Sequence, residues 1–215
     1  GEELVFSRNK SGFDDLYIYS VAADKERRIS AKLRSKDPSF SPDGERIVFV
    51  HNEDGTNNLG LIDRDGTGLV YLTNNNDATQ YSAPRFSPDG EWLLFSVFRG
   101  EDRDIAMMRA DSPPRPDFNK SSPGMENMMA KMMTKKGEED EDEEGEVEVM
   151  DVFPDSVAFA HPDSSGFRAL LASSADERDP AWLPDGSGFL FASDQGGIFN
   201  IYRYHMENGE VEQLT

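Results

Sequence analysis

Asp37-Pro38-Ser39-Phe40-Ser41-Pro42-Asp43-Gly44 is the stretch that decides the fold, because close copies of it recur along the chain. The second copy, 83–90, ends in Phe86-Ser87-Pro88-Asp89-Gly90, and the third, 179–186, ends in Trp182-Leu183-Pro184-Asp185-Gly186. Each copy leads into three apolar residues, of which the last is Phe49, Phe95 or Phe191. A phrase that recurs at intervals of a few tens of residues is typical of a repeat architecture.

The repeated unit can be followed from the glycine of this phrase to a closing pair of residues. A frame set on residues 44–73 aligns without gaps with 1–30 and with 186–215. The three closing pairs are Ile29-Ser30, Leu72-Thr73 and Leu214-Thr215. The unit that begins at Gly90 fits as far as Ile105 and is then interrupted; Leu171-Ala172 is its best match to a closing pair.

Each unit is predicted to contain four short strands. In the second unit these are 39–41, a run that ends at Phe49, a strand over 59–63, and one that ends at Thr73. Pro-Asp-Gly suits a turn, because Pro fixes φ, Asp bonds nearby backbone and Gly accepts positive φ. An Asx residue before the third strand, such as Asn58, can bond neighbouring N–H groups and start that strand.

The pattern of apolar residues indicates how the strands pack. Three consecutive apolar residues in the second strand imply burial on both faces of the sheet. Four short strands in a unit of about 45 residues, packed face to face, indicate a β-propeller. We therefore expect an all-β fold with about four four-stranded blades. The first blade is expected to be incomplete, because the chain begins at the second strand of a unit.

Residues that recur once per unit are expected to be structural. Phe40, Phe86 and Trp182 share one unit position, so we interpret them as core residues and not as a ligand cage. Asp43, Asp89 and Asp185 are expected to cap their own turns, since a carboxylate repeated once per blade is spread among the blades. The glycines that follow them, Gly44, Gly90 and Gly186, are expected to take positive φ.

The interruption of the third unit has a composition unlike that of a blade. It divides the chain into units one to three (1–110), an insertion (111–162), and the rest of unit three with unit four (163–215). A degenerate blade would fit its length, but Pro-rich 112–116 and the acidic run 138–148 favour a partly disordered insertion. The segments 147–150 and 157–160 are interpreted as a hairpin that rejoins the sheet.

Five methionines form the sharpest local feature of this insertion. Their spacing predicts one face of a helix, and they are Met125, Met128, Met129, Met132 and Met133. Methionine suits adaptable binding surfaces, so these residues are candidates for contact with a partner. The alternatives are that the helix packs on the propeller flank, that the segment has no fixed structure, or that the thioethers bind Cu(I).

The composition narrows the classes of partner. The chain has 42 Asp and Glu against 22 Lys and Arg. Nine of these acids lie in the run 138–148, which leaves 42 − 9 = 33 against 22 elsewhere. This balance opposes binding to nucleic acid and to anionic membranes. With no cysteine, the chain has neither a disulfide nor a thiolate metal site.

No targeting or spanning segment is evident in the sequence. No stretch approaches the ~18 apolar residues of a membrane span, and no signal peptide opens the chain. Residues 1–6 already resemble the interior of a domain, which suggests a processed or excised chain.

Sequence motifs for catalysis are missing. His51, His161 and His205 fall at different unit positions, and no Gly-x-Ser-x-Gly elbow, His-Glu-x-x-His pair or phosphate-binding loop occurs. We therefore expect a protein that is not an enzyme and has no cofactor. The segments 52–58 and 63–66 offer oxygen ligands for calcium, but neither has the bidentate Glu of an EF-hand loop.

The repeat phrases, the Leu-Thr unit ends and Asn200-Ile201-Tyr202 resemble TolB-type, WD-repeat-like propeller repeats of bacteria. The resemblance covers nearly all of the chain outside 111–162. It implies a non-catalytic scaffold that binds a protein partner in the periplasm or elsewhere outside the cytoplasm. It also implies further blades or a closing element, since such propellers usually have more units.

Similar repeats allow a second interpretation. They form the propellers that precede prolyl-oligopeptidase-like and tricorn-like serine peptidases, so the chain would then be a substrate-gating propeller whose catalytic domain lies outside it. A polyuronate lyase, a third class, would need a cluster of His and Gln ligands that the scattered histidines do not suggest.

Overall fold

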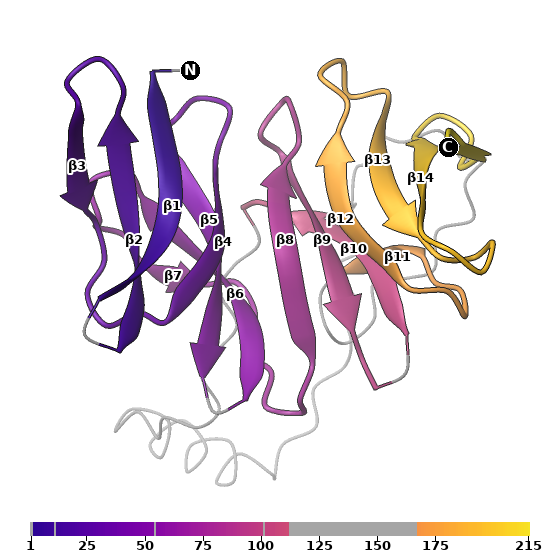
Figure 1. Ribbon diagram of the computed structural model, residues 1–215, viewed down its shortest axis with the longest axis horizontal. Coiled ribbons are helices and arrows are strands. Elements are labelled where there is room, and N and C mark those ends of the chain that lie inside the picture. Colours follow the sequence, from indigo (N-terminus) through magenta and orange to yellow (C-terminus); the bar gives the residue numbers. More distant parts are fainter. Residues whose placement is uncertain (1, 11, 54, 101, 112–166) are drawn as a thin grey trace, which may run out of the picture. The chain divides into compact units, whose positions relative to one another are not determined.

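The computed structural model describes residues 2–10, 12–53, 55–100, 102–111 and 167–215 (Figure 1). All the regular elements in these ranges are β-strands. None of the described residues forms a helix long and apolar enough to cross a membrane. The expected methionine helix, the acidic run, the hairpin over 147–150 and 157–160, and His161 lie outside the described residues.

The strands form four antiparallel groups that follow one another along the chain, which we call sheets one to four (Figure 1). A parallel pair between β6 and β8 joins the second and third groups into one eight-stranded sheet. Sheet one contains β1 (Glu3–Lys10), β2 (Phe13–Ser20) and β3 (Lys25–Arg28). Sheet two contains β4 (Ser35–Phe40), β5 (Arg46–Glu53), β6 (Thr56–Asp63) and β7 (Val70–Tyr71). Sheet three contains β8 (Gln80–Phe86), β9 (Trp92–Phe98), β10 (Arg103–Arg109) and β11 (Arg168–Leu171). Sheet four contains β12 (Glu177–Trp182), β13 (Gly188–Ser193), β14 (Asn200–His205) and β15 (Val211–Gln213).

This arrangement confirms the expected fold class. Three sheets have four strands, and sheet one has three because it lacks the strand that opens each of the others. The long interruption falls between β10 and β11, the third and fourth strands of sheet three. A single parallel pair, Asn57 with Gln80, also joins sheet two to sheet three.

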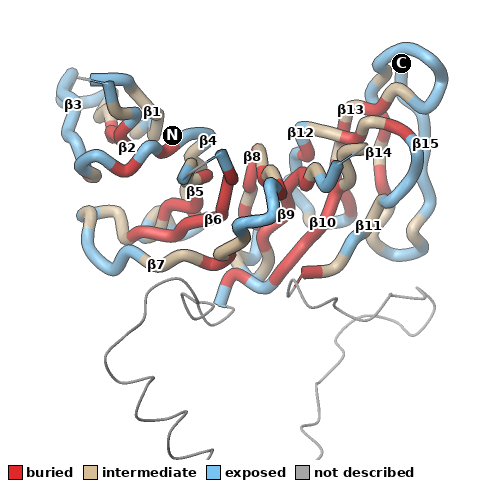
Figure 2. Tube along the Cα trace, turned by 90° about the horizontal axis from the view of Figure 1, so that it is seen from below, coloured by how far each residue is buried: buried red, intermediate tan, exposed pale blue. Residues whose placement is uncertain are grey.

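The second strand of each sheet is buried on both faces, as its apolar run predicts. Phe49 and Phe95 are 0% exposed and Phe191 is 3% exposed, so the three repeated phenylalanines have the same setting. Along β5, Ile47 and Phe49 pack toward sheet one, whereas Val48 packs toward sheet three. Figure 2 shows the buried positions concentrated in the middle strands, with the turns exposed.

Three apolar clusters fill the spaces between consecutive sheets. Between sheets one and two lie Leu16, Ile18, Ile29, Leu33, Ile47, Phe49 and Ile62. Between sheets two and three, the largest side chains are Tyr81, Phe86, Phe95 and Phe167. Between sheets three and four lie Leu94, Ile105, Met107, Phe189, Phe191, Tyr202 and Tyr204. Phe40 and Trp182 are half-buried at the edges of the first and third clusters.

The Pro-Asp-Gly turns are held by their own aspartates. The Oδ1 atom of Asp43 accepts hydrogen bonds from Ser41 Oγ and from the N–H of Glu45, at 2.5 and 3.0 Å. These bonds, with that from Ser41 first, lower the pKa of the Asp43 carboxyl. Asp89 accepts the same pair of bonds in sheet three.

The fourth sheet keeps the turn but changes the hydroxyl donor. Leu183 replaces the serine of the other copies, and Asp185 accepts instead from the N–H and Oγ of Ser187, at 3.0 and 2.7 Å. The glycine after the aspartate has positive φ in all three turns: 76° at Gly44, 78° at Gly90 and 71° at Gly186.

A hydroxyl group ties the last strand of a sheet to its third strand, and we call it the closing hydroxyl. It belongs to the second residue of the closing pair. In sheet one Ser30 Oγ accepts from the N–H of Leu16 at 2.9 Å, in sheet two Thr73 Oγ1 accepts from Leu59 at 2.8 Å, and in sheet four Thr215 Oγ1 accepts from Ile201 at 2.9 Å.

The closing hydroxyl also contacts the Asx residue that the sequence places just before this strand and that the structure places within it, Asn58 in β6 and Asp15 in β2. Thr73 Oγ1 donates to Asn58 Oδ1 at 3.0 Å, and Ser30 Oγ lies 3.2 Å from Asp15 Oδ1. Asn58 Oδ1 also accepts from the N–H of Asn75 at 2.8 Å. The Asx side chain therefore joins the third strand to the end of its sheet and to the segment that follows it.

Candidate functional site

The first strands of sheets two, three and four lie side by side, and their bulged segments form the candidate binding surface, which has exposed residues in β4 and β12 and buried or half-buried ones in β8. Strand β8 contacts both β4 and β12 (Figure 1). We define the inner-edge surface as 36–39, 82–85 and 178–181 of these strands. It contains the Asp-Pro or Ala-Pro dipeptide that begins each copy of the repeat phrase.

Each inner-edge strand is bent at the residue before proline. Asp37, Ala83 and Asp179 have φ of 52°, 49° and 56°, and the register of each strand shifts at this point. A residue before proline normally favours an extended conformation, and left-handed φ costs a residue other than glycine roughly 1–2 kcal/mol. Strain at three equivalent positions is therefore a feature of the repeat that the surrounding sheets hold in place.

The bends also connect neighbouring sheets. The N–H of Ala83 donates to Asp37 Oδ2 at 3.3 Å, and the N–H of Asp179 donates to Ser96 Oγ at 3.2 Å. The left-handed residue thus points its N–H group toward the preceding sheet.

The side chains of the inner-edge surface are polar and of mixed charge. Lys36, Asp37 and Asp179 are exposed, whereas Arg178 is half-buried. The Arg178 guanidinium lies over the ring of Phe199, 3.7 Å from its centroid, and within 3.4 Å of Asp176 Oδ2. Bulged edges resist the addition of another strand. The surface is therefore suited to recognition through side chains.

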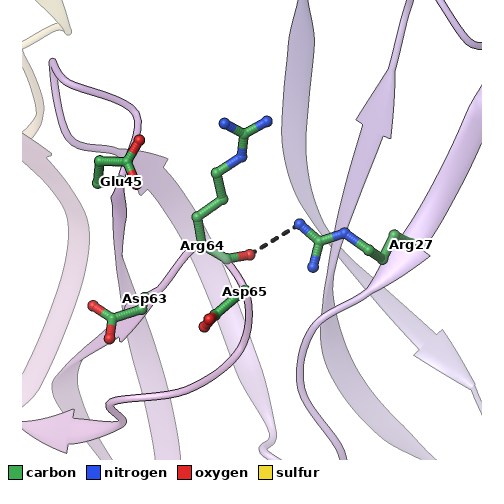
Figure 3. Close-up of a pocket in the computed structure, with 5 residues that line it drawn as sticks. All are labelled: Arg27, Glu45, Asp63, Arg64 and Asp65. Carbon is green, nitrogen blue, oxygen red and sulfur yellow. Dashed lines mark hydrogen bonds between the residues drawn. The ribbon is translucent and has the colours of Figure 1, made fainter.

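A separate pocket opens between sheets one and two (Figure 3). It has a volume of about 480 Å³ and is lined by Arg27, Glu45, Asp63, Arg64 and Asp65. Its arginines are already bonded, since Arg27 Nη2 donates to the Arg64 carbonyl at 3.0 Å and Arg64 pairs with Glu3. The hydrogen bond from Arg27 to the Arg64 carbonyl therefore joins sheets one and two beside this pocket.

The described histidines do not form a catalytic group. His51 Nδ1 donates to the Leu33 carbonyl at 2.6 Å, and its ring packs 4.9 Å from that of Tyr71. His205 lies in another sheet, with Nε2 3.4 Å from Glu212. Among the residues that the structure describes, no three His, Asp or Glu side chains are arranged to hold a metal ion.

The residues singled out in the sequence lie in different parts of the molecule. Asp43, Asp89 and Asp185 lie in separate turns, each after the first strand of its sheet, and do not meet. The five methionines lie outside the described residues. Sequence reasoning missed the strained residue before proline, although the repeated Asp-Pro dipeptides at 37–38 and 179–180 mark its position.

Comparison with known proteins finds similarity to a peptidase and to a TolB homologue. The chain is 26% identical over 172 residues to an uncharacterized peptidase, YuxL, of Bacillus subtilis, covering 75% of this chain and 22% of that protein. It is 30% identical over 104 residues to a TolB homologue of Chlorobium chlorochromatii, covering 40% of this chain and 23% of that protein. No family model matches the chain.

The structural comparison supports the fold. A putative TolB from Agrobacterium tumefaciens superposes with a TM-score of 0.67 at 18% identity, over 100% of this chain and 61% of that one. The chain therefore has a TolB-like β-propeller fold. It spans less than a quarter of the length of the two curated relatives.

Proposed function

We propose that this chain is a non-catalytic propeller scaffold that binds a protein partner through its inner-edge surface. The observation that carries the proposal is the alignment of three strained, bulged strands, of which the first and the third expose the charged side chains of Lys36, Asp37 and Asp179. Such a surface presents hydrogen-bonding side chains in fixed positions, which favours specific recognition. The resemblance to TolB supports a location outside the cytoplasm.

The second part of the proposal concerns the face of sheet four that points away from sheet three. Ile201 and Leu214 are 40% and 47% exposed, whereas their counterparts Leu59 and Leu72 in sheet two are buried. Leu59 and Leu72 belong to the cluster between sheets two and three. We propose that a further propeller sheet or another closing element covers Ile201 and Leu214 in the same way.

Charge reversal tests the role of the inner-edge surface. The test variant is Lys36→Glu/Asp179→Lys, which leaves the net charge unchanged. The matched control is Lys25→Glu/Glu207→Lys, on exposed residues of β3 and of the turn after β14. Cross-linking of the purified protein in an envelope extract, read by mass spectrometry, is expected to lose its main protein adduct in the test variant alone. The same adducts in all three proteins would refute the proposal.

The likeness to the Bacillus peptidase supports an alternative function. In this alternative the chain is the substrate-gating propeller of a serine peptidase whose catalytic residues lie elsewhere in the protein. A fluorophosphonate probe applied to the full-length protein distinguishes the two functions. Labelling at a serine within a Gly-x-Ser-x-Gly motif would support the peptidase, and a full-length protein without labelling would support the scaffold.

A further inference from the structure

Sheet three differs from the other sheets at the position of the closing hydroxyl. Its β11 pairs Leu171 with Ile105, just as Leu214 lies beside Ile201 in sheet four. The next residue is Ala172, where the other sheets have Ser30, Thr73 and Thr215. The Asx residue of this sheet, Asp104, therefore has no closing hydroxyl to donate to its carboxylate.

A buried acid from the next sheet occupies the same region. Glu177 is the first residue of β12 and is only 2% exposed. Its Oε1 accepts a hydrogen bond from Ser173 Oγ at 2.6 Å. Its Oε2 is buried and has no hydrogen-bond partner among the described residues. Asp104 is close enough to act on Glu177 electrostatically, and β10 contacts β12.

The other charged groups around this pair are largely engaged with one another. Asp176 lies 3.2 Å from Arg103 and 3.4 Å from Arg178. Asp102 adds negative charge near both Asp104 and Glu177, whereas the positive charge of Arg99 acts on Asp104. The arginines that neutralise Asp176 are thus not bonded to Glu177, whose buried oxygen keeps no donor.

We propose that Glu177 and Asp104 form a proton-linked contact between sheets three and four, in which Glu177 takes up a proton from solvent and the contact is tighter in that protonated state. Protonation removes the charge from a buried oxygen that nothing compensates. It also removes the repulsion between Glu177 and the negative charge of Asp104. A rise in pH therefore loosens this contact.

The electrostatics agree with this geometry. Burial first, and then the negative charge of Asp104, raise the pKa of Glu177, against the lowering effect of the Ser173 hydrogen bond. Burial also raises the pKa of Asp104. An acid whose pKa is raised by folding stabilises the folded state below its unfolded pKa, and this stabilisation is lost as pH rises through the folded pKa.

The test measures both the titration and its effect on stability in the whole protein. Carboxyl ¹³C NMR is expected to show Glu177 titrating above the ordinary Glu value of about 4.3, and Asp104→Asn is expected to lower that midpoint. Urea unfolding at pH 5 and pH 8 is expected to show that Glu177→Gln, which keeps the acceptor for Ser173, stabilises the protein at pH 8 and has little effect at pH 5. Glu207→Gln, at an exposed position, is the control and should behave like the wild type at both pH values.

The outcomes are decisive even if a variant fails to fold. An ordinary titration midpoint for Glu177 in the wild-type protein would overturn the proposal, as would a midpoint that Asp104→Asn leaves unchanged. Each unit by which folding raises the pKa corresponds to a tenfold change in the unfolding equilibrium constant between a pH below the unfolded pKa and a pH above the folded pKa, and the comparison of pH 5 with pH 8 measures the part of this change that lies above the unfolded value of about 4.3. An effect of Glu177→Gln that is equal at pH 5 and pH 8 would also overturn it.

Discussion

Replacement of Gly60 by alanine tests how the core between sheets one and two is packed. Gly60 lies directly opposite Phe49 in the β5–β6 pair. A Cβ atom at Gly60 would lie 2.5 Å from Cζ of Phe49 and 2.9 Å from each Cε atom. The Phe49 ring is fully buried, so it has to displace its neighbours in order to move away.

The expected cost follows from two opposing effects. Overpacking of a filled core destabilises by about 1–3 kcal/mol. Alanine is better than glycine in a strand by roughly 0.5–1 kcal/mol. We therefore expect Gly60→Ala to lower the free energy of unfolding by about 1–2 kcal/mol in urea denaturation. Sheet three pairs Ala106 with Phe95 at the equivalent position, so the strand itself accepts alanine and the cost belongs to the ring.

A double-mutant cycle separates the ring from the backbone. In a Phe49→Leu background the obstructing atoms are gone, and Gly60→Ala is expected to stabilise by roughly 0.5–1 kcal/mol, which gives a coupling energy of about 1–3 kcal/mol. Ala106→Gly is the control, with an expected loss of roughly 0.5–1 kcal/mol. If the effects of Gly60→Ala and Phe49→Leu add to within ~0.5 kcal/mol, the packing argument is wrong.

Three further predictions concern the closing hydroxyl, the strained bends and the turns. Thr73→Val leaves the Leu59 N–H without its acceptor and removes one of the two donors to Asn58 Oδ1, so we expect a loss of about 1–3 kcal/mol in urea unfolding; no loss would show that water replaces the hydroxyl. Ala83→Gly relieves a left-handed alanine and is expected to stabilise by about 0.5–1 kcal/mol. The control Ala181→Gly lies two residues beyond the equivalent left-handed position, Asp179, and is expected to destabilise; a loss in both variants would contradict the assignment of strain. Hydrogen bonds lower the pKa of Asp43 and Asp185, so the stability that these carboxylates contribute is present above their unfolded pKa and is lost as pH falls through their folded pKa. Between pH 6 and pH 3, the melting temperature of Asp43→Ala/Asp185→Ala should therefore fall less than that of the wild type.

The fold was predictable because the same local chemistry occurs several times. Pro-Asp-Gly fixes the turn. The apolar run through Phe49 requires burial on both faces of its strand, so a single unit already implies a neighbouring sheet on each side. The register of the units at Gly1, Gly44 and Gly186 then places each strand. The observed β4 and β6 begin earlier than expected, at Ser35 and Thr56, because polar residues continue the ladders beyond the apolar segments.

The binding surface was less predictable, since its features arise from contacts between sheets. The sequence rule for a residue before proline predicts an extended Asp37, and only the neighbouring sheet supports its left-handed conformation. The sequence showed Thr73 only as part of the recurring closing pair. Its role depends on hydrogen bonds to residues 58 and 59, which the fold brings close to it. The proposed link between Asp104 and Glu177 depends on the packing of β10 against β12, which no spacing in the sequence reports.

The position of the interruption gives β11 a different folding cost from the other outermost strands. The chain leaves β10 at Arg109 and returns at Arg168, whereas β6 and β7 are joined by the short segment 64–69. The connection 110–167 is longer than the connection 64–69 by roughly three doublings, and each doubling costs about 0.6 kcal/mol of loop-closure entropy. Because β11 also lacks a closing hydroxyl, its amides should exchange with deuterium ahead of those in β15. We therefore expect β11 to unfold locally while Phe95 stays buried.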